Sequence, residues 1–198
     1  MYKQFYFLAA LIFWATISQS QEVPGAVETK KKGCSCTFSP IFNIGLAEGE
    51  NGTSLQLQTI QGIRYGKWFA GIGAGLDYYQ LRTIPLFLDI RREFFKGKHA
   101  PFIYADGGYH FAWATDNDKG SYTKISYDGG LYYDVGLGYR IGSATKQNGF
   151  LISAGYSFKY LREAHTSQVC INWNCQEETN EWFRYKLNRL SLKIGMKL

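Results

Sequence analysis

The chain has 198 residues, a formal net charge of +6, 45% hydrophobic residues, 17% aromatic residues and 22 glycines. A disordered chain is poor in aromatic residues, and glycine inside a helix costs about 1 kcal/mol relative to alanine, so these values exclude disorder and disfavour a helix-rich domain. A helical membrane protein needs about 20 consecutive apolar residues per span. Beyond residue 20, the longest comparable run is Trp68 to Leu76, which is too short. The composition therefore favours β-structure in a single domain.

Residues 1–20 have the three parts of a secretory signal peptide. Lys3 lies in a short basic region, an apolar core runs from Phe5 to Ile17, and small residues precede the expected cleavage after Ser20. The alternative is a membrane anchor, but the apolar core is shorter than the roughly 20 residues that a span requires. We interpret residues 21–36 as a flexible basic leader and residues 37–198 as one exported domain, in a compartment where disulfides can form.

Eight segments of the domain alternate between apolar and polar residues with a period of two, which is typical of strands. No segment shows convincing helical periodicity. The predicted strands are Phe38–Glu48, Thr53–Tyr65, Trp68–Tyr79, Ile84–Phe95, Pro101–Trp113, Gly129–Ile141, Phe150–Leu161 and Trp182–Leu198. The last of them places Leu190, Leu192, Ile194 and Met196 on one face, opposite Arg189, Ser191, Lys193 and Lys197.

Alternation alone does not say which face is inside. A soluble barrel turns its apolar face inward, whereas a transmembrane barrel turns it toward lipid and keeps polar residues in the lumen. Small residues on the polar face favour the second arrangement, because they suit the crowded interior of an eight-stranded barrel. They are Gly71, Gly73, Gly75, Gly108, Gly136, Gly138 and Gly155. Aromatic residues near the strand ends are typical of membrane-interface girdles: Trp68, Tyr78, Tyr79, Trp113, Tyr160 and Trp182.

The connector lengths agree with this interpretation. With a periplasmic N-terminus, the inner connectors are short, near residues 66–67, 96–100 and 142–149, and two outer connectors are long, at 115–128 and 162–181. Short inner turns and longer outer loops are typical of outer-membrane barrels. We therefore predict an all-β protein: an eight-stranded antiparallel up-and-down transmembrane β-barrel with a polar lumen that side chains fill.

Residues 71–113 resemble the small outer-membrane β-barrel proteins of Bacteroidetes-type Gram-negative bacteria, which include PorT-like and OmpA-like eight-stranded barrels. The phrases GIGAGLDYYQLRTIPLFLDIRREFF and PFIYADGGYHF carry the resemblance, and LSLKIGMKL resembles the C-terminal strand that the barrel-insertion machinery reads. The resemblance implies the fold and an outer-membrane location. Some PorT-like members take part in protein secretion, so it also implies a secretion or transport accessory role as an alternative function.

The polar face predicts a network of charges in the lumen. Its members are Asp77, Asp89, Arg91, Glu93, Asp106, His110, Asp134, Arg140, Lys159, Arg189 and Lys193. Buried charges must pair or carry a large penalty, so we expect ion pairs that plug the barrel. A path for protons or ions is the alternative.

Two pairs of residues raise the question of catalysis. Asp106 and His110 share a face, and a His–carboxylate pair can orient a base for hydrolysis; His165 and Ser167 form a second, weaker pair. Some eight-stranded barrels modify lipids, so an enzyme of this kind is one hypothesis. No serine lies in a nucleophile-type context, and we expect no catalytic residue, cofactor or metal.

Four cysteines occur in the exported domain and its leader. Cys170 and Cys175 bracket four residues of the last long connector, and we expect a loop-closing disulfide there. Cys34 and Cys36 are separated only by Ser35, a spacing that strains a direct bridge, so their partners stay open.

The expected function is a structural or surface-interaction role, without catalysis, through the connectors at 115–128 and 162–181. The positive charges are spread along the chain and form no single patch for nucleic acid. We expect a monomer that contacts outer-membrane lipid and lipopolysaccharide, and the barrel-insertion machinery during biogenesis.

Overall fold

The computed structural model describes residues 36–50, 52–79, 81–95, 97–113, 123–142, 148–171 and 174–198. All of these lie in Cys34–Leu198, the second of two compact units of the chain. The expected signal peptide and nearly all of the expected leader fall outside the described residues. In the described part of the chain, no helix has the length and apolar character needed to cross a membrane.

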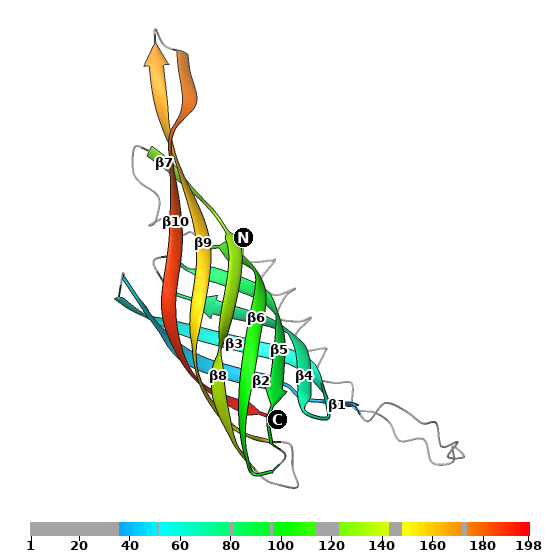
Figure 1. Cartoon of the computed structure of the whole chain (residues 1–198). Coiled ribbons are helices and arrows are strands. Elements are labelled where there is room, and N and C mark those ends of the chain that lie inside the picture. Colours follow the sequence, from blue (N-terminus) through cyan, green and yellow to red (C-terminus); the bar gives the residue numbers. More distant parts are fainter. Residues whose placement is uncertain are drawn as a thin grey trace, which may run out of the picture. The chain divides into compact units, whose positions relative to one another are not determined.

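The described chain is built from antiparallel strands. Their bounds are β1 Cys36–Phe38, β2 Ile41–Gly49, β3 Gly52–Tyr65, β4 Trp68–Asp77, β5 Thr83–Glu93, β6 His99–Ala112, β7 Thr123–Asp128, β8 Gly130–Gly142, β9 Gly149–Ile171 and β10 Asn174–Lys197. Their hydrogen-bonded order is β1-β3-β2-β10-β9-β8-β6-β5-β4, with an additional β3–β4 pairing. That pairing closes a ring of eight strands, while β1 and β7 add short pairings to β3 and β9 (Figure 1). The predicted eight-stranded antiparallel barrel is confirmed.

The two faces of the barrel wall have inverted polarity relative to a soluble protein. Leu88, Leu137 and Leu190 on the outer face are 62%, 66% and 68% exposed, whereas the interior holds charged side chains such as Asp89 at 0%. Soluble barrels place these groups the other way round, because water solvates charge and excludes hydrocarbon. The alternation therefore predicted the correct faces for β10.

The glycines of the inner face make room for interior aromatic rings. A Cβ at Gly73 would overlap the ring of Phe87, and a Cβ at Gly138 would overlap the ring of Phe102. Both rings belong to a buried cluster inside the barrel. Glycine at these wall positions thus lets large side chains fill a narrow lumen, as expected from the sequence.

Gly138 gives a direct test of this packing. We expect Gly138→Val to lower the free energy of unfolding by about 1–3 kcal/mol, because the added side chain must displace the Phe102 ring. Urea unfolding of the folded barrel in lipid vesicles measures the loss. Leu137→Val, a change at the neighbouring outward residue, is the control and should leave stability nearly unchanged. An equal loss from the two variants would contradict the packing argument.

The first predicted strand, Phe38–Glu48, is interrupted in the structure. Proline has no backbone N–H and is confined to strand edges and irregularities. The strand is interrupted at Ser39 and Pro40, between β1 and β2. There the Ser39 amide donates a hydrogen bond to the Gly62 carbonyl at 2.9 Å. The five predicted strands that correspond to β3–β6 and β8 agree with the structure within two residues at each end.

The predicted long connector at 162–181 is wrong as a loop. β9 and β10 continue through it as a paired hairpin that extends beyond the closed ring, and β7 pairs with β9 along residues 162–167 (Figure 1). The alternation stopped being visible there because neither face of the hairpin needs to meet lipid. We call this extension, residues 162–188 with the gap at 172–173, the projecting hairpin.

Candidate functional site

The interior charges form three clusters along the barrel. The hairpin-end cluster lies where the projecting hairpin leaves the ring, the central cluster lies in the middle, and the C-terminal-end cluster lies near Leu198. The eleven residues of the expected network are all buried in the interior: Asp77, Asp89, Arg91, Glu93, Asp106, His110, Asp134, Arg140, Lys159, Arg189 and Lys193.

The hairpin-end cluster is centred on one carboxylate. Asp77 of β4 binds the Lys159 ammonium at 2.6 Å and the Arg189 guanidinium at 2.9 Å. Lys159 also donates a hydrogen bond to Thr83 at 2.7 Å. β4 is distant in sequence from β9 and β10, which carry the two cations, so the cluster depends on closure of the ring.

An apolar layer covers this cluster on the side of the projecting hairpin. It consists of Tyr79, Leu81, Leu161 and Leu187, all buried. The Arg189 guanidinium lies 4.7 Å from the centroid of the Tyr79 ring, within the range of a cation–π interaction. The expectation that Tyr79 belongs to the outer aromatic girdle is therefore wrong. The Tyr79 backbone amide donates a hydrogen bond to the Asp77 carboxylate at 3.0 Å, and this bond holds Tyr79 at the start of the β4–β5 connector.

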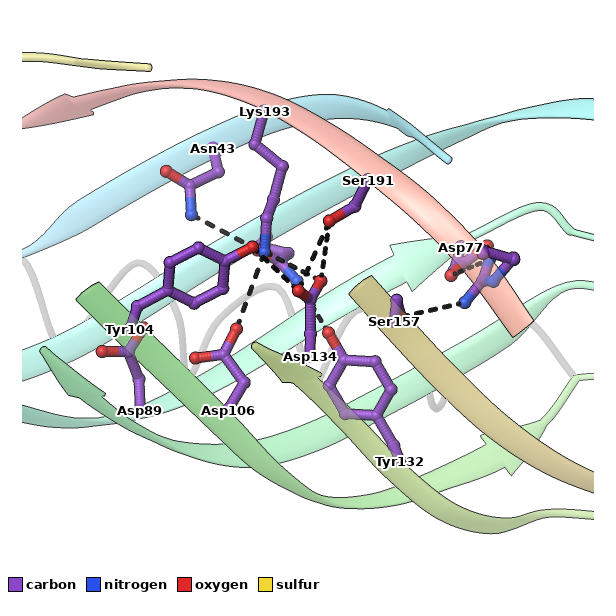
Figure 2. Close-up of polar contacts among 12 residues, drawn as sticks. Asn43, Asp77, Asp89, Tyr104, Asp106, Tyr132, Asp134, Ser157, Ser191 and Lys193 are labelled. Carbon is purple, nitrogen blue, oxygen red and sulfur yellow. Dashed lines mark hydrogen bonds and ion pairs between the residues drawn. The ribbon is translucent and has the colours of Figure 1, made fainter. Parts of the chain in front are cut away.

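The central cluster contains a row of three aspartates on neighbouring strands. Asp106 is the register partner of both Asp89 and Asp134. Like charges directly opposite one another are unfavourable, and two cations offset them. Arg91 binds Asp89 through two nitrogens, at 2.6 and 2.8 Å. Lys193 lies 2.9 Å from Asp134 and 3.7 Å from Asp106 (Figure 2).

Neutral side chains complete the central cluster. Tyr104 donates to Asp134 at 2.8 Å, and Ser191 donates to the same carboxylate at 3.3 Å (Figure 2). Beside them, Gln58 donates to the hydroxyl of the fully buried Tyr132 at 3.1 Å. These side chains fill the space between the charged groups, and each of them makes a hydrogen bond.

At the C-terminal end, one carboxylate meets three cations. Glu93 binds Arg64 at 2.5 Å, Arg140 at 3.1 Å and Lys197 at 3.5 Å. Arg64 and Lys197 were not among the residues predicted for the network. Lys197 shares the face of Lys193 and was visible in the alternation, whereas Arg64 lies at the end of a segment that alternates weakly.

The Asp106–His110 pair that suggested catalysis is not assembled. The His110 Nε2 atom lies 2.9 Å from the Tyr160 carbonyl, and neither oxygen of Asp106 has a hydrogen-bond partner among the described residues. His165 contacts Glu163 at 2.6 Å, and the Ser167 side chain lies outside the described residues. Within the described part, no group of three or more His, Cys, Asp or Glu side chains is placed to hold a metal ion.

The predicted disulfide falls at the tip of the projecting hairpin. Cys170 and Cys175 are register partners in the β9–β10 ladder. Their side chains lie outside the described residues, so the Cys170–Cys175 bond stays a prediction. Cys36 is disulfide-bonded.

The outward apolar face and the ion-paired interior together define the class: the chain has the fold of a transmembrane β-barrel. No protein-family model and no curated protein matches the sequence. Among solved structures, the outer membrane protein OprG from Pseudomonas aeruginosa is similar at 9% identity, covering 81% of this chain and 95% of that one with a TM-score of 0.55. This likeness is one of fold.

Two further solved structures match over most of the chain. The N-terminal β-barrel domain of OprF from Pseudomonas aeruginosa is 12% identical, covering 81% of this chain and 97% of that one with a TM-score of 0.47. The outer membrane protein AlkL, solved in DMPC lipid bilayers, is 10% identical, covering 90% and 95% with a TM-score of 0.43.

Proposed function

We propose that the protein is an integral barrel of the bacterial outer membrane, without catalytic activity, which acts structurally and through surface interactions of its projecting hairpin. The observation that carries the proposal is the continuation of β9 and β10 beyond the closed ring. Such an extension is unnecessary for closing the barrel, since β2 pairs only with Arg189–Lys197 of β10.

The projecting hairpin has the properties of a binding element. Among the described residues, β10 between Trp182 and Asn188 pairs with β9 on one side and has no strand on the other. Trp182 and Phe183 are 61% and 39% exposed there. An open strand edge can accept an extended segment of a partner, and exposed aromatic residues supply contact area. The hairpin therefore suits an extended protein segment at the cell surface.

A protease site inserted between Ile171 and Asn174 tests location and orientation together. We expect the hairpin to be cut in intact cells, because it lies outside the outer membrane. The control is the same insertion at residues 66–67, in the turn at the opposite end of the barrel, which should be cut only after lysis. Cleavage of the hairpin only after lysis would overturn the proposed orientation.

The three ion clusters and the apolar layer argue for a closed lumen. Asp77, Lys193 and Arg189 are each 2% exposed or less, and moving an ion past such groups requires breaking buried pairs. In planar lipid bilayers we expect the purified protein to give no steady ohmic current steps. Steps of reproducible size would favour the alternative, a path for ions through the lumen.

The sequence resemblance to PorT-like barrels of Bacteroidetes supports a second candidate function, that of an accessory to secretion or transport. It rests on residues 71–113. A deletion strain with an unchanged set of secreted proteins would remove this candidate. We also propose a monomer without cofactors; acyl release from phospholipid or lipopolysaccharide by the purified protein would contradict the absence of catalysis.

A further inference from the structure

We propose that the outward face of β9 and β10, at the base of the projecting hairpin, binds the phosphate group of a membrane lipid through Arg162, Arg184 and Lys186. We call these three residues the cationic patch. The proposal rests on the proposed function, because it requires that the hairpin leave the membrane on the side of its outer leaflet.

The register of the two strands concentrates positive charge in this patch. Arg184 is the direct partner of Arg162, and Lys186 is the partner of Tyr160 one position along the same face. All three cations are exposed. Like charges directly opposite one another across a ladder are destabilising unless an anion lies between them. In the described part of the chain, no ion pair reaches any of the three.

The neighbouring carboxylates do not cancel this charge. Asp128 of β7 is the partner of Arg162 on its other side and is the single acidic residue directly opposite the patch among the described residues. Glu163 lies on the opposite face of β9 and binds His165. Toward β2, Glu48 accepts a hydrogen bond from Thr53. Three cations therefore face one adjacent carboxylate, and the patch has an excess of positive charge.

The patch begins where the apolar band of the barrel ends. The outward residues of β9 from Phe150 to Tyr160 span about 33 Å along the strand, or about 25 Å along the axis at the usual barrel tilt, which is the height of the apolar band in outer-membrane barrels. Arg162 is the next outward residue, and no register shift interrupts this part of the ladder. The cations consequently lie at the depth of lipid phosphates.

Aromatic residues flank the cations on both sides. The Arg162 guanidinium lies 5.5 Å from the centroid of the Tyr160 ring, and Trp182, at 61% exposed, follows Arg184 on the side of the hairpin tip. Tyrosine and tryptophan prefer the membrane interface. Two adjacent guanidinium groups can bind the oxygens of one phosphate by paired hydrogen bonds, which a single lysine cannot do. Chemistry and depth both point to a phosphorylated lipid.

The test compares lipid adducts of the purified full chain by native mass spectrometry. The probe is bisphosphorylated lipid A added to the protein in neutral detergent, with diacylglycerol, which has no phosphate, as the reference lipid. The triple variant Arg162→Gln/Arg184→Gln/Lys186→Gln should bind lipid A at least tenfold more weakly, because each lost charge-assisted hydrogen bond to phosphate costs roughly a factor of ten. Diacylglycerol binding should stay unchanged.

A charge-matched control separates a defined site from general attraction. Lys67→Gln/Arg92→Gln/Lys98→Gln removes three exposed cations at the other end of the barrel. It should leave lipid A binding within twofold of the unmodified protein. An equal loss in both triple variants would overturn the proposal, and so would a wild-type adduct that millimolar inorganic phosphate displaces completely, since the ligand would then be a free anion.

The outcome is independent of the test of the proposed function. If the hairpin is cut in intact cells but the triple variant binds lipid A as tightly as the unmodified protein does, the proposed lipid site is wrong. The proposed surface barrel then still stands. If the hairpin is cut only after lysis, the proposed orientation fails whatever the lipid result.

Discussion

Replacing Asp77 with alanine is expected to lower the free energy of unfolding by about 3–5 kcal/mol, because removing one partner of a buried ion pair leaves uncompensated charge in the interior. Asp77 is the carboxylate that both Lys159 and Arg189 contact, at 2.6 and 2.9 Å. The side chains of the three residues are 2% exposed or less. Without Asp77, two buried cations have only hydroxyl groups such as that of Thr83 as acceptors. Urea unfolding in lipid vesicles, followed by tryptophan fluorescence, measures the loss.

Two further variants test whether the buried charge causes the expected loss of stability in Asp77→Ala. Glu50→Ala removes an exposed carboxylate from the β2–β3 turn and should change stability by less than about 0.5 kcal/mol. Asp77→Ala/Lys159→Met/Arg189→Met replaces the whole cluster with apolar groups and should recover most of the loss. A loss below about 1 kcal/mol in Asp77→Ala would show that the cluster is solvated, and the closed lumen would be contradicted with it.

The alternation in the sequence predicted the wall of the barrel because only one face of each strand meets lipid. The four outward apolar residues of Leu190–Met196 could be assigned without the structure, and so could the inward position of Arg189 and Lys193. The direction of the faces followed from inner-face glycines such as Gly138, which a solvated surface would not need. Local pattern and fold agree here because the membrane imposes the pattern.

The projecting hairpin could not be predicted in this way. Between Arg162 and Trp182 both faces of the ladder carry polar residues, so a period of two has no hydrophobic signal to reveal it. Strand pairing there is visible only in the register, for example Glu163 with Phe183. The sequence therefore predicted a long loop where the chain continues two strands.

The contacts between side chains in the lumen could not be predicted from the sequence either. Alternation assigned Asp77 and Lys159 to the interior, but their contact joins residues 82 positions apart. Which inward residues meet depends on the stagger of eight strands around the ring, a property of the closed barrel. Tyr79 shows the opposite error, since an aromatic residue at a strand end was assigned to the outer girdle and instead lies under Arg189.

The interior aromatic rings lead to a second large expected effect. Tyr132 is 0% exposed in the middle of the lumen, its ring centroid lies 5.5 Å from that of Phe87, and its hydroxyl accepts a hydrogen bond from Gln58. We expect Tyr132→Ala to lower the free energy of unfolding by about 3–5 kcal/mol, because the surrounding wall cannot collapse into the space that the ring leaves. The same urea titration measures it.

Tyr132→Phe separates the ring from its hydroxyl. It keeps the packing against Phe87 and removes the acceptor of Gln58, so the expected loss is about 1–3 kcal/mol, the cost of a buried donor left without a partner. Tyr133→Ala is the matched control, since Tyr133 is the neighbouring tyrosine on the outer face, stacked on Phe158, and lipid fills the volume that its ring vacates. If Tyr133→Ala cost as much as Tyr132→Ala, the filled lumen would not be the source of the barrel's stability, and the closed interior would have to be explained by its ion pairs alone.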